Sequence, residues 1–85
     1  RIFSPSLGEK IYFELEINRG TEFDVKIFNI NGKFIDYADE NIESLNWSWD
    51  GNDKNGNMVP FGIYILYFIS DSGELSHKEA VVVVK

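Results

Sequence analysis

The segment from Trp47 to Tyr64 constrains the fold of this chain more than any other part of it. An alternating apolar stretch, Trp47-Ser48-Trp49, runs into a polar loop at 50–57 and leaves it, after Pro60, as a second apolar stretch. The loop consists of Asp, Gly, Asn and Lys, and the first three are residues that turns prefer. The segment therefore predicts two β-strands joined by a long connection of definite shape, without a set of residues that performs chemistry.

Length and composition indicate one small domain without covalent cross-links. The chain has 85 residues, of which 44% are hydrophobic and none is cysteine. A chain of this length buries only a little more than about 60% of the surface that its unfolded form exposes, so nearly every apolar side chain has to contribute to a core. Without cysteine, neither disulfides nor thiolate metal sites can add stability. We expect residues 1–85 to form a single domain, and the start at Arg1 without an initiator Met indicates a segment of a longer protein.

The charge balance argues against two classes of partner. The formal net charge at pH 7 is −6, and the eight basic residues are scattered rather than clustered as a phosphate-binding surface requires. The longest apolar run, Ile63 to Ile69, is far shorter than the roughly 18 residues of a membrane span. We therefore expect neither nucleic-acid binding nor membrane insertion.

Alternation of apolar and polar residues predicts strands along most of the chain. The segment Thr21–Ile30 leads into Asn31-Gly32, a strong signal for a two-residue type I′ hairpin turn, whereas the acidic segment Ala38–Glu43 is expected to be a loop. The expected strands are Ile2–Ser4, which Pro5 would end, Lys10–Ile17, Thr21–Ile30, Lys33–Tyr37, Leu45–Trp49, Gly62–Ser70 and Lys78–Val84. The expected inward residues of the half-buried strands are Ile11, Phe13, Leu15, Ile17, Phe23, Val25, Ile27, Leu45, Trp47 and Trp49. Six or seven short strands of this kind predict an all-β fold, an antiparallel Ig-like β-sandwich.

The strand Gly62–Ser70 is apolar on both faces. Ile63, Ile65, Tyr67 and Ile69 fall on one face, and Tyr64, Leu66 and Phe68 fall on the other. A two-layer sandwich buries one face of each sheet, so the second face either is covered or meets another domain. We expect Tyr64, Leu66 and Phe68, or the alternate set, to form an exposed apolar patch together with Phe28 and Ile30.

Two stretches of the sequence resemble a known family. Trp49-Asp50-Gly51-Asn52-Asp53-Lys54-Asn55-Gly56, followed by Val59-Pro60-Phe61-Gly62-Ile63-Tyr64, resembles the Ig-like domain of bacterial flagellar hook-capping proteins, with its pattern Trp-Asp-Gly-x-Asp-x-x-Gly and then Val-Pro-x-Gly-x-Tyr. The stretch Val25–Ile35 resembles that family's apolar strand and glycine hairpin. The chain is also similar to the C-terminal sorting domains of the type IX secretion system, which share the Gly-x-Tyr strand and a Lys-rich end.

The resemblance implies a β-sandwich without catalytic residues, cofactor or metal. Such modules are C-terminal appendages of secreted or surface proteins, so the expected role is that of a spacer, an anchor or a docking module on the outside of a bacterial cell. The expected partners are a neighbouring domain of the same polypeptide, another surface protein or a second copy of the chain. A C-terminal sorting domain is an alternative within the same resemblance.

The loop from Asp50 to Asn57 is a candidate cation site because it is dense in oxygen ligands. Its spacing does not match an EF-type loop, since a start at Asp50 places Lys54 at the fifth position and Phe61 at the twelfth. We expect a structural network instead, in which the Asp50 carboxylate accepts backbone N–H groups and Gly51 and Gly56 adopt conformations that other residues resist.

Carbohydrate binding is the alternative from another functional class. Trp47 and Trp49 are the obvious stacking platform, but they share the phase of Leu45 and are expected in the core, which leaves Tyr12, Tyr37 and Phe28 as surface aromatics. His77 is the single histidine and cannot build a zinc site alone, so we expect a solvated residue at a strand entry. The carboxylate pairs Glu14 with Glu16 and Asp39 with Glu40 are expected to be solvated rather than catalytic.

Overall fold

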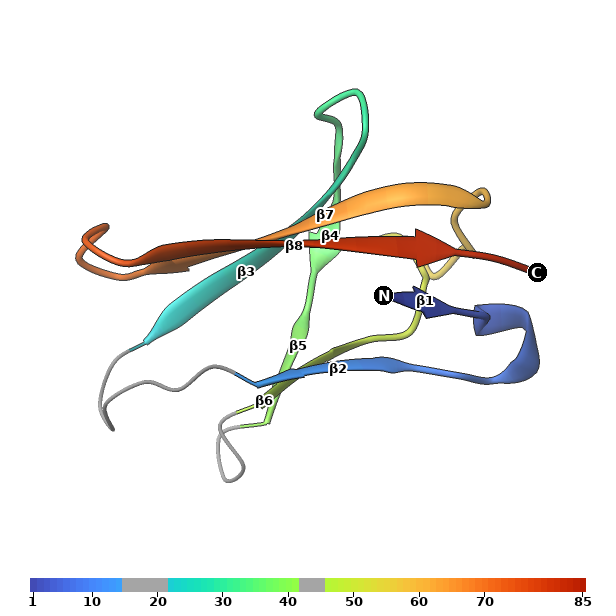
Figure 1. Cartoon of the computed structure of the whole chain (residues 1–85), viewed down its shortest axis with the longest axis horizontal. Coiled ribbons are helices and arrows are strands. Elements are labelled where there is room, and N and C mark those ends of the chain that lie inside the picture. The colour runs from blue at the N-terminus through green and yellow to red at the C-terminus, as the bar shows by residue number, and fades with distance from the viewer. Residues whose placement is uncertain (15–21, 42–45) are drawn as a thin grey trace.

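A computed structural model describes residues 1–14, 22–41 and 46–85 and shows two β-sheets that face each other (Figure 1). Strands are ordered β1-β8-β7-β3-β4 in a five-stranded sheet and β2-β6-β5 in a three-stranded sheet. The elements are β1 (Ile2–Phe3), the 3-10 turn η1 (Pro5–Leu7), β2 (Ile11–Glu14), β3 (Phe23–Asn29), β4 (Phe34–Tyr37), β5 (Asp39–Asn41), β6 (Asn46–Trp49), β7 (Gly62–Ser70) and β8 (Ser76–Val83). The neighbours pair antiparallel except β1 and β8, which pair parallel.

The predicted all-β sandwich is confirmed. Within the described ranges it has eight strands rather than six or seven, and no helix there is long and apolar enough to cross a membrane.

The additional strand is β5, which lies in the segment that was expected to be a loop. Asp39, Glu40 and Asn41 pair antiparallel with β6. All three are exposed, so this edge strand is held by backbone pairing and carries no apolar alternation that the sequence could reveal. The prediction of a loop over Ala38–Glu43 was therefore wrong for residues 39–41, and residues 42–45 lie outside the described ranges.

The hairpin between β3 and β4 also differs from the expected two-residue turn. The N–H of Asn29 donates to the carbonyl of Lys33 (2.9 Å), and the N–H of Gly32 donates to the carbonyl of Asn29 (3.0 Å), which closes a three-residue loop at 30–32. Gly32 has φ of +83°, as the last residue of such a loop requires. The side-chain oxygen of Asn29 accepts the N–H groups of Asn31 and Lys33, both at 2.9 Å. This side chain favours the longer loop, which the Asn31-Gly32 pair alone does not indicate.

The core lies between the sheets and is rich in aromatic rings. Trp47 and Trp49 from β6 are each 2% exposed, so the prediction that both tryptophans are buried is confirmed. The ring of Phe68 on β7 contacts that of Trp47 edge-on, with 5.5 Å between centroids. The buried apolar set is Phe3, Ile11, Phe13, Phe23, Val25, Ile27, Trp47, Trp49, Val59, Tyr64, Leu66, Phe68, Val81 and Val83. It contains the expected inward residues of β2, β3 and β6, while Leu15, Ile17 and Leu45 lie outside the described ranges.

The first turn of the chain packs against the start of the long loop. Gly51 is buried with φ of +83°, and a Cβ added there would lie 2.2 Å from Cγ of Pro5. A side chain at this position would therefore be both strained and in collision. Close contact between Gly51 and Pro5 fixes the loop that follows β6 to the segment that links β1 with β2.

The two faces of β7 differ in burial. Tyr64 is 4% exposed, and Leu66 and Phe68 are fully buried, so these three point into the sandwich. Of the two sets that the sequence left open for the exposed patch, the alternate set, with Ile63 at 44% exposure, faces outward. The hydroxyl of Tyr64 donates to the carbonyl of Pro60 (2.7 Å), as in the tyrosine corner of β-sandwiches. Burial raises the pKa of the Tyr64 phenol above its ordinary value.

Candidate functional site

The candidate site is the side of the five-stranded sheet that points away from the three-stranded sheet, here named the outer face. Because side chains alternate along a strand, the register of the strands places the members of this face in rows across the sheet. The rows are Ile2, Val82 and Ile63; Ala80, Ile65, Phe28 and Phe34; Lys78, Tyr67, Lys26 and Tyr37; and Ser76, Ile69 and Asp24. Apolar and aromatic side chains thus continue across all five strands without a described layer above them. Such a face on a small domain is a candidate contact surface.

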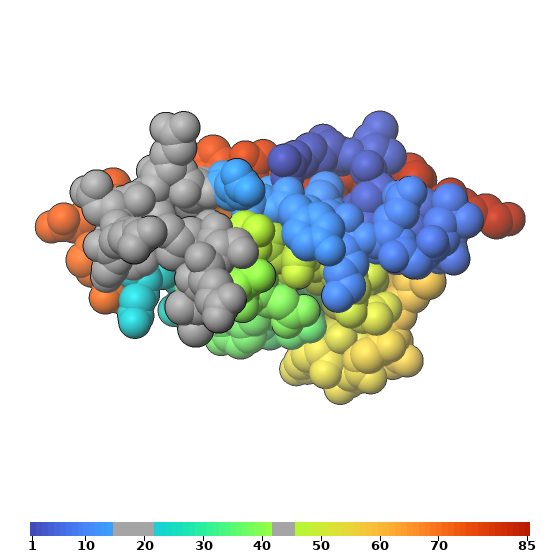
Figure 2. Space-filling view, turned by 90° about the horizontal axis from the view of Figure 1, so that it is seen from below, coloured from blue at the N-terminus to red at the C-terminus, as the bar shows by residue number. Residues whose placement is uncertain are grey.

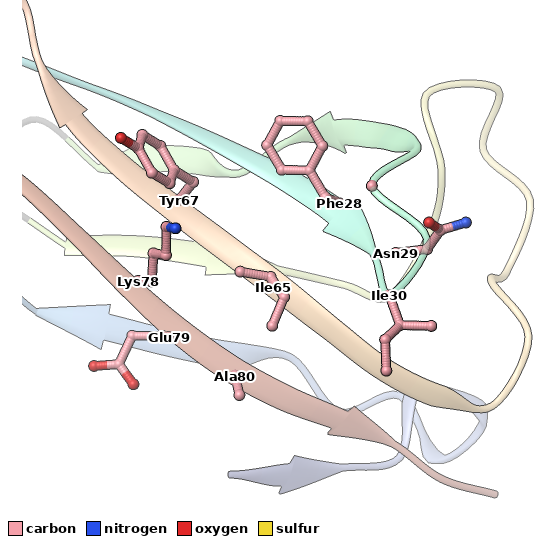
Figure 3. Close-up of a pocket in the computed structure, with 9 residues that line it drawn as sticks. Phe28, Asn29, Ile30, Ile65, Tyr67, Lys78, Glu79 and Ala80 are labelled. Carbon is pink, nitrogen blue, oxygen red and sulfur yellow. The ribbon is translucent and has the colours of Figure 1, made fainter.

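The outer face is hollowed beside the β3–β4 hairpin (Figure 3). The hollow has a volume of about 540 Å³. Phe28 and Ile30 lie on the hairpin side of it, and Ile65 of β7 forms part of its floor. The remaining lining residues are Asn29, Gly32, Tyr67, Lys78, Glu79 and Ala80. A hollow of this kind can accept a large side chain from a partner.

Three charged side chains share the outer face in the rows defined above. Nζ of Lys78 lies 5.3 Å from the centroid of the Tyr67 ring, within the range of a cation–π contact. Lys26 is the register partner of Tyr67 on β3, and Asp24 lies two residues before it. Within the described ranges neither lysine nor Asp24 forms an ion pair. In a chain of net charge −6, the face therefore carries more positive than negative charge.

The exposed aromatic rings of this face do not form a flat platform. Phe28 and Phe34 meet at an interplanar angle of 71°, and Phe34 and Tyr37 meet at 66°. Sugar rings stack best on aromatic faces that lie in a common plane, and these rings contact each other edge-on. Since Trp47 and Trp49 are buried, the tryptophan platform considered for carbohydrate binding is excluded.

The loop at 50–57 is a hydrogen-bonded network, as expected. Oδ1 of Asp50 accepts the N–H of Asn52 at 2.9 Å, and Oδ1 of Asp53 accepts the N–H groups of Asn55 (2.9 Å) and Asn57 (3.0 Å). Both carboxylates thus orient the backbone of the loop. Gly51 and Gly56 have the predicted positive φ, of +83° and +82°. Figure 2 shows this loop, in yellow, projecting beyond the three-stranded sheet.

We expect the melting temperature to be the same in millimolar calcium and in a chelator. The two carboxylates already accept N–H groups, and no group of three or more His, Cys, Asp or Glu in the described ranges is placed to hold a metal. A ligand at 100 times its dissociation constant would stabilise the fold by about 2.7 kcal/mol, a shift of several degrees in a domain of this size. Calorimetry would measure this shift. A lower melting temperature in the chelator would contradict the interpretation of the loop as a hydrogen-bonded network without a cation.

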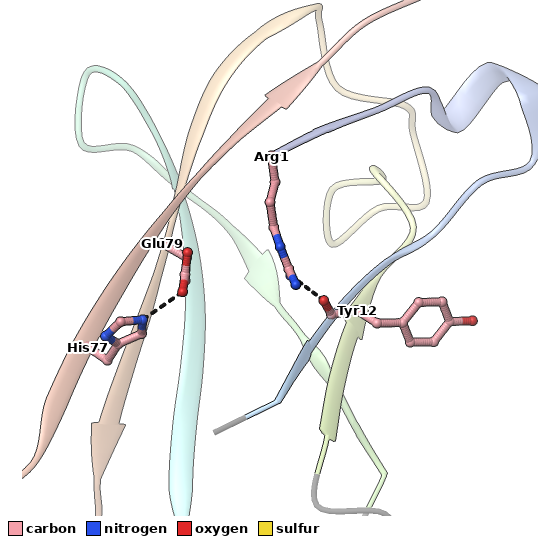
Figure 4. Close-up of polar contacts among 4 residues, drawn as sticks. All are labelled: Arg1, Tyr12, His77 and Glu79. Carbon is pink, nitrogen blue, oxygen red and sulfur yellow. Dashed lines mark hydrogen bonds and ion pairs between the residues drawn. The ribbon is translucent and has the colours of Figure 1, made fainter. Parts of the chain in front are cut away.

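Two further polar side chains make defined contacts, those of His77 and Arg1. His77 is exposed, as expected, and its Nε2 lies 2.7 Å from Oε1 of Glu79 on the same strand (Figure 4). Arg1 donates to the carbonyl of Tyr12 and lies over the Phe13 ring, with 4.7 Å from Cζ to the centroid. It therefore links β1 of one sheet to β2 of the other.

Three of the four carboxylates considered as pairs in the sequence lie in the described ranges, and all three are exposed. Glu14, Asp39 and Glu40 are exposed on strands of the smaller sheet, and Glu16 lies outside the described ranges. Their solvation agrees with the structural interpretation of these residues.

Comparison with known proteins supports the fold and leaves the family open. No family model matches the sequence, and no curated protein matches it. Among solved structures, the chain is similar to part of PorZ from Porphyromonas gingivalis, described as an essential bacterial surface component of the type IX secretion system, with a TM-score of 0.60 and 21% identity. The match covers 74% of this chain and 8% of PorZ. At this identity the likeness shows a shared β fold, and the resemblance to hook-capping domains gains no support from it.

Proposed function

We propose that this chain is a non-catalytic docking domain of an exported or cell-surface bacterial protein. Its outer face would contact a neighbouring domain of the same polypeptide, another surface protein or a second copy of the chain. The observation that carries the proposal is the continuous apolar outer face, with Ile63 at 44% exposure and Ile2 at 69%, opposite a sheet whose outward residues are mainly polar. A stable protein contact needs an apolar centre, which the rows of Ile63 and Ile65 would supply, and the charged residues of the face lie in the two rows that follow.

The polar groups of the described residues support a role without chemistry. The carboxylates of Asp50 and Asp53 hold the loop, and Glu79 pairs with the exposed His77. A catalytic acid or base needs a hollow that alters its pKa and positions a substrate. The hollow of the outer face is lined mainly by apolar groups, and its Lys78 lies over an aromatic ring.

The likeness to a segment of PorZ supports the setting outside the cell and favours a second candidate function. A C-terminal sorting domain of the type IX secretion system would have a β fold of this kind, consistent with the sequence resemblance to such domains. A reporter protein fused to this chain, in a bacterium that has the system, would then be exported. A reporter that stays inside the cell would contradict the sorting role and leave the docking role intact.

Carbohydrate binding is the less favoured alternative. The surface aromatics that it needs are present on the outer face, but their rings are tilted against each other by 66–71°. Two lysines beside Tyr67 are also better suited to carboxylates of a protein partner than to neutral sugar hydroxyls. We therefore expect no retention on insoluble neutral polysaccharides.

The docking role predicts protection of the outer face from hydroxyl radicals in the longer polypeptide. Tyr37 on the outer face and Tyr12 on the other sheet are matched probes, with exposures of 56% and 57%. Oxidation of Tyr37 should fall at least about threefold between the 85-residue chain alone, diluted until it is monomeric, and the longer polypeptide with its partner, because a docked interface excludes water from its core. Tyr12 should oxidise equally in both, and mass spectrometry of the peptides would measure the ratio. Equal oxidation of Tyr37 in both samples would refute docking through this face.

A further inference from the structure

The outer face carries both signs of charge on one strand, in an arrangement that can complement itself. Asp24 and Lys26 lie two residues apart on β3 and belong to adjacent rows of the face. Asp24 is exposed, Lys26 is partly exposed, and neither forms an ion pair within the described ranges. Each therefore has the opposite charge as its near neighbour and no ion-pair partner among the described residues.

A two-fold axis makes such a pair reciprocal. In a two-fold interface, residue i of one copy contacts residue j of the other, and j contacts i. An axis that runs between two stacked outer faces, across the strands at the level of Val25, sets Asp24 of each copy opposite Lys26 of the other. Tyr67 and Ile69 are the register partners of Lys26 and Asp24 on β7, so the same axis sets Tyr67 opposite Ile69. One operation therefore joins two charge pairs and an apolar contact.

The charge of the whole chain makes this face the favourable one for two copies to meet. Each copy has a net charge of −6, so copies repel each other at long range. The outer face carries Lys26 and Lys78 beside Asp24, so two outer faces that pair Asp24 with Lys26 repel each other less than two faces with acidic residues alone. The outward residues of the three-stranded sheet include Glu14 and Asp39 without a described lysine on its strands, so that sheet offers no comparable surface.

We infer that the partner of the outer face is a second copy of this chain, in a two-fold dimer that pairs Asp24 with Lys26 of the other copy. This inference rests on the proposed docking function and names its partner. Aligned packing of two β-sheets about 10 Å apart would bury the rows that contain Tyr67 and Ile69. Lys78 would lie toward the rim, where its contact with Tyr67 keeps it solvated.

Sedimentation equilibrium of the 85-residue chain tests the dimer and its pairing. The wild-type chain should show a monomer–dimer equilibrium below about 1 mM, the weak limit of specific association. Lys26→Asp and Asp24→Lys should each weaken the dimer about tenfold or more, because each sets two like charges opposite each other. The double variant Asp24→Lys/Lys26→Asp should regain wild-type affinity, since the axis pairs the exchanged charges again. Lys10→Asp, an exposed position before β2 with the same change of charge as Lys26→Asp, is the matched control and should keep more of the affinity.

Each outcome decides the inference. A chain that stays monomeric up to about 1 mM overturns the second copy as partner, and the radical-protection experiment then still decides whether the face docks on another protein. Single variants that weaken the dimer without rescue in the double variant overturn the reciprocal pairing. Circular dichroism of every variant confirms that the fold is intact, as these surface positions predict. If a single variant unfolds, the dimer affinities of the wild-type chain and the double variant still test the dimer and its pairing.

Discussion

We expect Trp49→Ala to lower the free energy of unfolding by about 3–5 kcal/mol, the range for removing a large buried aromatic side chain. Trp49 is 2% exposed, and its ring contacts those of Phe3 (5.6 Å) and Tyr64 (5.4 Å). Its Nε1–H donates to the carbonyl of Asn52 (2.9 Å), so the substitution also frees an acceptor at the start of the long loop. The variant therefore has a cavity in the core and also lacks the hydrogen bond that holds the loop to Trp49.

In a small domain such a loss approaches the whole stability. Single domains unfold with about 5–15 kcal/mol, and short chains lie near the lower limit. Chemical denaturation followed by fluorescence of Trp47 would measure the difference. Tyr12→Ala, at a position that is 57% exposed, is the control and should cost less than about 1 kcal/mol. A Trp49→Ala variant with the midpoint of the wild type would contradict the position of this side chain in the core.

The sequence predicted strands well where one face is apolar and the other polar. Phe23, Val25 and Ile27 on β3 and the two tryptophans of β6 are buried as their alternation indicated. A period of two in the sequence corresponds directly to one buried and one solvated face of the sheet, so nothing further is needed to place these strands. The turn network at 50–57 was also predictable, because its Asp and Gly residues stabilise turns through local interactions.

Prediction failed where the deciding interaction is not part of the pattern of apolar and polar residues or of the turn dipeptide. β5 is polar throughout and exists because β6 offers a backbone edge, which no pattern in residues 39–41 records. The β3–β4 loop is longer by one residue because the side chain of Asn29 accepts two N–H groups across it. In both cases the information lies in another segment or in a neighbouring side chain.

The sequence predicted that β7 has an apolar face beyond the core, but not which residues form that face. The sequence indicated that β7 has a surplus apolar face and that Phe28 and Ile30 adjoin it, which is where the hollow lies. The sequence could not decide which face of β7 points outward, because both faces are equally apolar. The choice depends on packing against aromatic rings of the three-stranded sheet, such as those of Phe13 and Trp47. Tyr64 gave a usable signal, since a tyrosine four residues after Pro60 fits the tyrosine corner and points inward.

The central claim is that the two faces of β7 have different roles, one holding the sandwich together and the other free for contact. Phe68 is fully buried between the rings of Phe13 (5.8 Å) and Trp47 (5.5 Å), whereas Ile63 on the same strand is 44% exposed. Phe68→Glu would bury a carboxylate without a partner and should cost about 5 kcal/mol or more, which unfolds a domain of this size. Ile63→Glu places the same charge on the outer face and should cost about 1 kcal/mol.

Thermal melts of these two variants beside the wild type, followed by circular dichroism, test that claim most directly. The structure predicts no cooperative transition for Phe68→Glu and a transition within a few degrees of the wild type for Ile63→Glu. A folded Phe68→Glu variant, or an Ile63→Glu variant that fails to fold, would show that the faces of β7 are assigned the wrong way round.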